Sequence, residues 1–113
     1  MMNGKIGLEE HFALEGTLGD SRNFVGADIW TDLRARLLDV QDIRLREMDA
    51  NGIELMILSL NSPAIQAITD TPMAGETAQR TNDFLAAEIA KNPTRFRGFA
   101  ALPMQDPDLA ARE

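Results

Sequence analysis

Short segments of strand length alternate with longer amphipathic ones along this chain, and this alternation restricts the fold more than any other feature. The short segments run from Lys5 to His11, from Ile53 to Leu60 and from Phe96 to Leu102, and the last two are apolar. Between them, apolar residues recur every three or four positions from Ile29 to Asn51, as one helix or a broken pair, and from Ala74 to Lys91. This order predicts an α/β fold with a parallel sheet and right-handed crossovers.

Residues that begin and end helices support these boundaries. Gly52 supplies a left-handed cap after the first helical segment, and Pro93 follows the end of the second. Asp106 precedes a proline and an apolar run, which is typical of the start of a further helix. We expect Asp28 or Thr31 to cap the first helix.

The composition excludes several classes of function. Basic residues number 11 against 18 acidic residues, a net charge of -7, and they are scattered, so neither nucleic acid nor an anionic membrane is an expected partner. The chain has no cysteine, so any metal must have oxygen and nitrogen ligands. Neither a signal-peptide core in Met1 to Leu8 nor an apolar stretch of membrane-spanning length is present, and we expect a soluble cytoplasmic protein.

A carboxylate and an imidazole lie near the end of the first strand-length segment. Alternate side chains share one face of a strand, so Glu9 and His11 are expected on the same face and Glu10 on the other. Such a pair can chelate one divalent ion, and strand ends of this kind carry the active sites of parallel α/β folds. A hydrogen-bonded or solvated histidine has the same pattern, and His11 is the only histidine in the chain.

The loop from Phe12 to Asp28 is longer than a connection requires, so it is either an active-site loop or a surface excursion. Phe24 within it could stack on an aromatic substrate or pack the loop onto the protein. Asn61 and Ser62 could line the same site or only form a turn. We expect Asn82, which interrupts an apolar stripe, to bond a nearby backbone group.

Several motifs occur in an order that resembles a known family. They are Gly4-Lys5-Ile6-Gly7-Leu8-Glu9-Glu10-His11-Phe12, Leu37-Leu38-Asp39 with Arg44-Leu45, Met48-Asp49-Ala50-Asn51-Gly52-Ile53-Glu54, Leu58-Ser59-Leu60-Asn61-Ser62-Pro63, and Arg95-Phe96 with Phe99-Ala100-Ala101-Leu102-Pro103-Met104-Gln105-Asp106-Pro107. Together they resemble the aromatic acid decarboxylases of the amidohydrolase superfamily that act on gamma-resorcylate and 2,3-dihydroxybenzoate. The resemblance covers essentially the whole chain, and the alignment is least certain from Gly19 to Asn23.

The resemblance implies that residues 1–113 are the N-terminal part of a single metal-dependent (β/α)8 barrel domain. Three strands cannot close such a barrel, which needs eight strands and roughly 250 residues. The implied activity is reversible, non-oxidative decarboxylation of a small hydroxylated benzoate such as 2,6- or 2,3-dihydroxybenzoate. One divalent ion, zinc or manganese, would be held in part by Glu9 and His11, with no organic cofactor, and Phe24 would contact the substrate ring.

The resemblance also implies a homo-oligomer. The remaining ligands and the general acid have no counterpart in these residues, so we expect the chain alone to be inactive and assign no general acid. Two alternatives remain open. One is a metal-dependent hydrolase or lactonase of the same superfamily, although Glu-x-His in place of His-x-His favours the decarboxylase. The other is a non-catalytic chain that associates with another chain.

Overall fold

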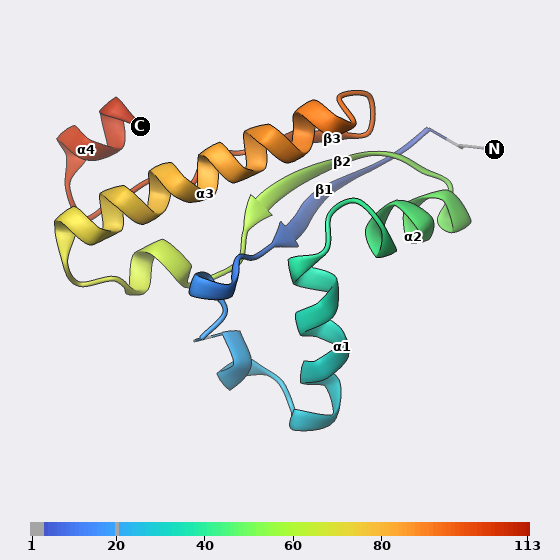
Figure 1. Cartoon of the computed structure of the whole chain (residues 1–113), viewed down its shortest axis with the longest axis horizontal. Coiled ribbons are helices and arrows are strands. Elements are labelled where there is room, and N and C mark those ends of the chain that lie inside the picture. Colours follow the sequence, from blue (N-terminus) through green and yellow to red (C-terminus); the bar gives the residue numbers. More distant parts are fainter. Residues whose placement is uncertain (1–3, 20) are drawn as a thin grey trace.

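The computed structural model describes residues 4–19 and 21–113. Residues 1–3 and 20 lie outside this description. All of them fall within the predicted domain range 1–113, residues 1–3 in the segment from Met1 to Leu8 and residue 20 in the predicted long loop. The strands are β1 (Lys5–Phe12), β2 (Ile53–Leu60) and β3 (Phe96–Gly98), and the α-helices are α1 (Ala27–Leu38), α2 (Ile43–Asn51), α3 (Thr71–Lys91) and α4 (Pro107–Arg112). Short 3-10 turns occupy η1 (Glu15–Thr17), η2 (Ser21–Phe24) and η3 (Ala64–Ala67). Figure 1 shows the long helix α3 running beside the strands and α1 projecting away from them.

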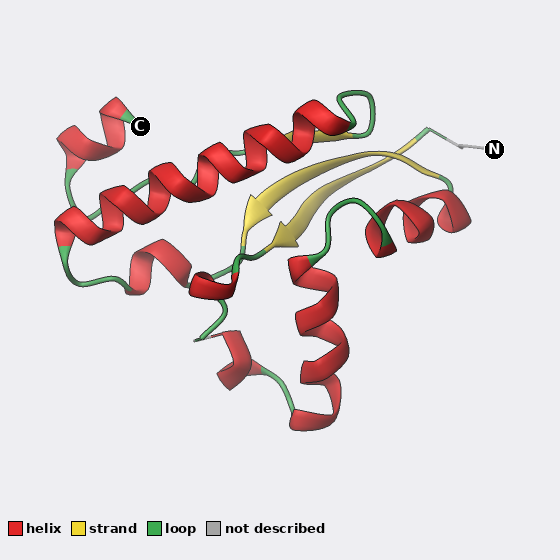
Figure 2. Ribbon diagram, in the orientation of Figure 1, coloured by secondary structure: helices red, strands yellow, loops and turns green. Residues whose placement is uncertain are grey.

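The three strands form one parallel sheet in the order β1-β2-β3, as the alternation predicts. Helices cover the face to which Met56, Leu58 and Phe96 point, and these side chains join Met48 of α2 and Leu85 of α3 in one buried cluster. The alternation of helices and strands around this cluster is visible in Figure 2. The α/β class is therefore confirmed in the described part of the chain.

The first helical segment is broken, and Asp39 explains where the break falls. Its carboxylate accepts hydrogen bonds from the backbone nitrogens of Asp42 at 3.3 Å and Arg44 at 2.8 Å, so it satisfies donors at the start of α2 that have no helical partner. At the other end of α2, Gly52 has φ 69 and is the expected left-handed cap. A broken pair of helices, rather than one long helix, is therefore the correct alternative.

The predicted cap of α1 is wrong. The helix begins at Ala27 with Gly26 as its N-cap, and no side chain caps it. Asp28 and Thr31 lie inside the helix, where the carboxylate of Asp28 in the first turn still faces the positive end of the helix dipole. The helix start predicted at Asp106 is confirmed, because Asp106 accepts hydrogen bonds from the backbone nitrogens of Asp108 and Leu109.

The third strand is shorter than its apolar run suggests. It ends at Gly98, not at Leu102, although the nitrogen of Phe99 still bonds the carbonyl oxygen of Leu58 at 2.9 Å. Beyond that point the backbone of Ala101 is hydrogen-bonded to the side chain of Asn82. The Oδ1 of Asn82 accepts from the nitrogen of Ala101 at 2.7 Å, and its Nδ2 donates to the carbonyl oxygen of Ala101 at 2.9 Å. The backbone of Ala101 is thus held by helix α3 and not by the sheet.

The chain also has no helix, within its described residues, that is both long and apolar enough to cross a membrane.

Candidate metal centre at the carboxyl end of β1

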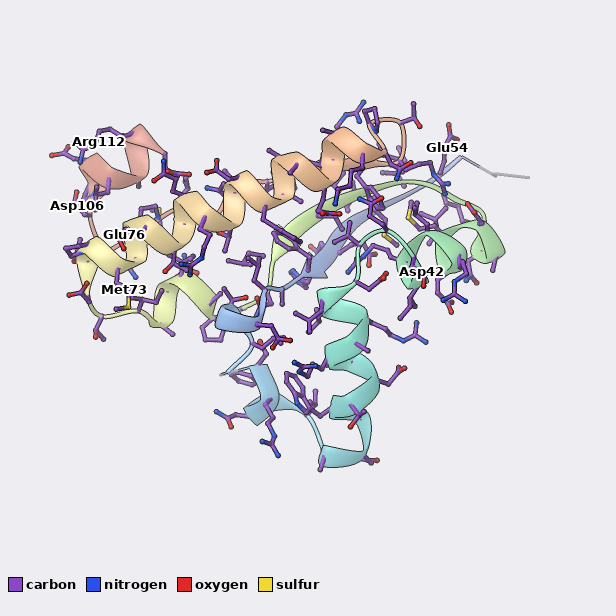
Figure 3. The ribbon with its side chains drawn as sticks, in the orientation of Figure 1. Asp42, Glu54, Met73, Glu76, Asp106 and Arg112 are labelled. Carbon is purple, nitrogen blue, oxygen red and sulfur yellow. The ribbon has the colours of Figure 1, made fainter. Side chains whose placement is uncertain are left out.

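All three strands point toward the same end of the sheet, where η1, η2 and η3 follow β1 and β2 (Figure 1). Glu54 lies at the opposite end, where β2 begins (Figure 3). The carboxyl ends of parallel strands are where α/β enzymes place their sites. The candidate residues lie at the expected end of the sheet.

A bulge in β1 determines which side chains face which way. Gly7 pairs with Met56 and Glu10 with Leu58, so Leu8 and Glu9 together lie opposite the single residue Ile57. Because Met56 and Leu58 point to the helices, Gly7 and Glu10 share that face. A Cβ at position 7 would lie 3.0 Å from the Cγ of Glu10, so a larger residue there would require the side chain of Glu10 to shift.

The side chain of His11 lies on the other face. His11 pairs directly with Ser59, and the Oγ of Ser59 is 3.1 Å from the Nδ1 of His11. Glu9 and His11 are both exposed. Within residues 4–19 and 21–113, the carboxylate of Glu9 has neither a hydrogen-bond nor an ion-pair partner. The predicted separation of Glu10 from His11 across the strand agrees with this register.

Arg44 fixes the end of β1 from the helix side. Its guanidinium donates to the carbonyl oxygens of His11 at 2.6 Å, Arg36 at 3.2 Å and Asp39 at 3.2 Å. Burial lowers the pKa of Arg44 from its ordinary value, and the nearby carboxylates of Glu10 and Asp39 partly oppose this effect. Glu10 therefore contributes to the charge environment of Arg44 and not to the face that carries His11.

A cavity of about 360 Å³ brings His11 and Phe24 together. Val25, Leu33 and Leu37 supply its apolar wall, and the side chain of Phe24 is 77% exposed. An exposed aromatic ring beside an imidazole is suited to contact with a flat aromatic ligand. Glu9 does not line this cavity, although it is on the same strand two residues from His11.

Asn61 holds the loop that carries Phe24. Its buried carboxamide donates to the carbonyl oxygen of Thr17 at 2.8 Å and to the Oγ of Ser21 at 2.7 Å, and it accepts from the Oγ1 of Thr17 at 2.9 Å. Ser21 in turn donates to the carbonyl oxygen of Ser62 at 2.9 Å. Asn61 is more than a turn former, because it ties the end of β2 to the long loop after β1.

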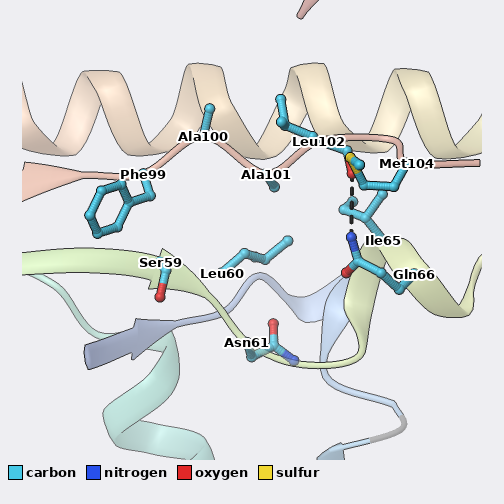
Figure 4. Close-up of a pocket in the computed structure, with 10 residues that line it drawn as sticks. All are labelled: Ser59, Leu60, Asn61, Ile65, Gln66, Phe99, Ala100, Ala101, Leu102 and Met104. Atoms are coloured by element: carbon cyan, nitrogen blue, oxygen red, sulfur yellow. Dashed lines mark hydrogen bonds between the residues drawn. The ribbon is translucent and has the colours of Figure 1, made fainter. Parts of the chain in front are cut away.

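A second hollow, of about 280 Å³, lies between the ends of β2 and β3 (Figure 4). Figure 4 shows Ser59 directing its side chain toward β1, while Gln66 donates to the carbonyl oxygen of Leu102 at 3.3 Å. The hollow contains Phe99, which is 60% exposed, but no ionisable side chain. The chemistry of this end of the sheet is therefore concentrated on the β1 side.

Sequence reasoning missed Ser59 and Arg44. Ser59 interrupts an otherwise apolar run, and the pairing of parallel strands could have placed it beside His11. Arg44 gave no such signal, since its three acceptors are backbone carbonyl oxygens, and the most distant of them, that of His11, is 33 residues away in sequence.

The donors at this end suit a divalent ion such as zinc or manganese, because they are a carboxylate oxygen and an imidazole nitrogen. They are fewer than a complete site needs. No group of three or more histidine, cysteine, aspartate or glutamate side chains arranged to hold a metal occurs in the described part of the chain. Glu9 and His11 therefore have the chemistry of part of a metal site, and their role as ligands stays a prediction.

Known proteins resemble the chain over almost all of its residues. Over 112 residues it is 70% identical to the gamma-resorcylate decarboxylase of Polaromonas sp. (strain JS666), an alignment that covers 99% of this chain and 34% of that protein. No protein-family model matches. The chain thus spans about a third of the length of the curated relatives it matches.

Solved structures give the same result. The dihydroxybenzoic acid decarboxylase of Polaromonas sp. JS666, solved with bound manganese and the inhibitor 2-nitroresorcinol, matches with a TM-score of 0.95 and 69% identity over 98% of this chain and 33% of that one. A 2,6-dihydroxybenzoate decarboxylase complexed with 2,6-dihydroxybenzoate matches with a TM-score of 0.96 and 62% identity over 99% of this chain and 35% of that one. The expected fold, three strands and their helices from an incomplete (β/α)8 barrel, is confirmed. By sequence and by structure, this chain therefore resembles the amidohydrolase-type aromatic acid decarboxylases over about a third of their length.

Proposed function

We propose that the protein to which this chain belongs is a divalent-metal-dependent decarboxylase of a hydroxylated benzoate, with 2,6-dihydroxybenzoate as the first candidate substrate and the 2,3-isomer as the second. One observation carries the proposal: the exposed imidazole of His11 and the exposed ring of Phe24 open into one cavity at the carboxyl ends of the strands. The relatives supply the substrate class, because their names specify gamma-resorcylate and dihydroxybenzoate.

Glu9 and His11 are the residues of this chain that would hold the ion. The carboxylate and an ortho hydroxyl of the substrate would chelate an ion held there, and this chelation would orient the substrate ring. Manganese is the first choice, because a similar structure contains it, and zinc is the second. No organic cofactor is included in the proposal.

Phe24 would hold the substrate ring by stacking, and the apolar wall of Val25, Leu33 and Leu37 would exclude water from it. The described residues supply two ligands and no general acid is assigned among them, so the activity is proposed for the whole protein. Residues 1–113 would form one part of a single barrel domain in a cytoplasmic homo-oligomer. Cell fractionation and light scattering of the intact protein would test these last two points.

The decisive experiment supplies the intact protein with 2,6-dihydroxybenzoate and measures resorcinol by chromatography. We expect turnover that is lost on chelation and restored by added Mn²⁺. A Glu9→Gln variant should lower both bound metal and turnover. The proposal is wrong if the metal-loaded protein hydrolyses an aromatic-derived lactone but releases no resorcinol, since that result would identify a hydrolase.

A further inference from the structure

The imidazole of His11 has two nitrogens in different surroundings. The Nδ1 atom is 3.1 Å from the Oγ of Ser59, whereas Nε2 has no hydrogen-bond partner among residues 4–19 and 21–113. A neutral imidazole carries its proton on one nitrogen and a lone pair on the other. Only a nitrogen with a free lone pair can bind a cation, so the position of this proton decides whether His11 can act as a ligand.

Strand pairing keeps Ser59 in this position. Ser59 lies directly opposite His11 in the register of β1 and β2, and the neighbouring pairs Glu10 with Leu58 and Phe12 with Leu60 flank it. Leu58 is fully buried on the helix face, so β2 cannot rotate its serine away from His11 without exposing that core residue. The hydroxyl is therefore held beside Nδ1 by the sheet itself.

The backbone of His11 is held as well. Arg44 donates to its carbonyl oxygen at 2.6 Å, and the nitrogen of Asn61 donates to the carbonyl oxygen of Phe12 at 2.9 Å. With the strand end fixed from both sides, the ring of His11 has mainly its own side-chain torsions left to set. A single hydrogen bond to Nδ1 is then enough to select an orientation.

Resting on the proposed function, we infer that Ser59 is a positioning residue that accepts the Nδ1 proton of His11 and so presents the unprotonated Nε2 to the metal. The hydroxyl occupies the direction in which an ion would approach Nδ1, which leaves Nε2 as the ligand atom. The Ser59 hydroxyl can turn its own proton toward solvent, because Ser59 lies at the hollow between β2 and β3. Partners of this kind raise metal affinity by fixing the tautomer of the ligand.

The test uses the intact protein with its metal removed. Binding of Mn²⁺ is measured by calorimetry for wild type, Ser59→Ala and Ser59→Thr. Ser59→Ala should weaken binding by about 10–100-fold, the range typical of residues that orient a histidine ligand. Ser59→Thr restores the hydroxyl and should bring the affinity back to near the wild-type value. Thr94→Ala, which removes an exposed hydroxyl in the turn before β3, should leave metal affinity unchanged.

Nitrogen-15 NMR of the histidine rings reports the tautomer directly, with the His11 signal assigned by its loss in His11→Gln. Wild type should carry the proton on Nδ1, and Ser59→Ala should give a mixture of tautomers at unchanged fold. A purely structural role for Ser59 would alter thermal stability but not this ratio.

The two proposals fail in different ways. If the metal affinity of wild type is unchanged by His11→Gln, His11 is not a ligand and the proposed function fails. If His11→Gln abolishes binding while Ser59→Ala alters neither affinity nor tautomer, only the role of Ser59 is overturned. Protonation of Nε2 in the wild-type protein would overturn it as well.

Discussion

Replacement of Asn61 by aspartate tests how the loop after β1 is held. The two side chains have nearly the same volume, but a carboxylate cannot donate the hydrogen bonds that Asn61 gives to the carbonyl oxygen of Thr17 and to Ser21. Each buried acceptor left unpaired costs about 1–3 kcal/mol, and the new carboxylate also faces the Thr17 carbonyl oxygen at close range. We expect Asn61→Asp to lower the free energy of unfolding by about 3 kcal/mol at neutral pH.

This destabilisation should depend on pH. Burial raises the pKa of the introduced carboxyl in the folded state above its value in the unfolded chain, so the folded state binds more protons between the two values. The variant therefore regains stability as pH falls through the folded-state pKa, since the protonated group can again donate one hydrogen bond. At higher pH the full loss should be seen.

Urea denaturation of the intact protein at several pH values measures the effect. Asn23→Asp is the matched control, because Asn23 is exposed in the same loop and should change stability by less than about 0.5 kcal/mol. Trypsin cleavage after Arg22, which lies in η2, should be faster in Asn61→Asp than in wild type or in Asn23→Asp. A loss below about 1 kcal/mol, or one that does not change with pH, would refute the assigned hydrogen-bond network.

Three further substitutions probe other parts of the structure. His11→Ala and Glu9→Gln should weaken metal binding by more than the roughly 10–100-fold that is typical of residues that only orient a ligand. Glu10→Gln should weaken it much less, because Glu10 is assigned to the opposite face of β1. Equal losses of metal affinity in calorimetry would contradict this assignment of faces. Gly98→Ala should destabilise the protein by about 1–3 kcal/mol, because the added Cβ would lie 2.5 Å from the Cδ2 of Leu85. In the control Gly16→Ala the nearest atom to the added Cβ is 4.0 Å away, so this variant should have the melting temperature of wild type. Arg44→Ala should lower the free energy of unfolding by about 2–4 kcal/mol, because it removes hydrogen bonds to three carbonyl oxygens. Arg46→Ala breaks an exposed ion pair and should lower it by less than about 1 kcal/mol in the same thermal unfolding assay.

The elements of the fold could be predicted because their signals are local. The apolar run of β2, the glycine after α2 and the proline after α3 lie within a few residues of the boundaries that they determine. The end of β3 could not be found in this way. Its apolar run continues to Leu102, but its last pair with β2 is Gly98 with Leu58, and the pairing groups of Ala101 are taken by Asn82 of α3. The end of this strand therefore depends on contacts with another element, which no single segment reveals.

The candidate site follows the same division. Glu9, His11 and Phe24 stand out by residue type and by resemblance, and their functional roles remain predictions. The contacts of Ser59, Asn61 and Arg44 depend on which segments meet in space, at sequence separations of 48, 44 and 33 residues from their partners. The residues that could act on a ligand were thus visible in the sequence, whereas the residues that hold them in place were not.

The bulge in β1 also determines where this strand can tolerate a change in length. Gly7 and Glu10 are three residues apart on β1, but their partners Met56 and Leu58 are only two apart on β2. Deleting Leu8 would equalise the two counts and leave every later pair, His11 with Ser59 included, in its present alignment. Inserting a residue between Glu10 and His11 would instead reverse which face the following side chains point to. The bulge is therefore a place where an evolutionary deletion can be absorbed before it reaches the histidine.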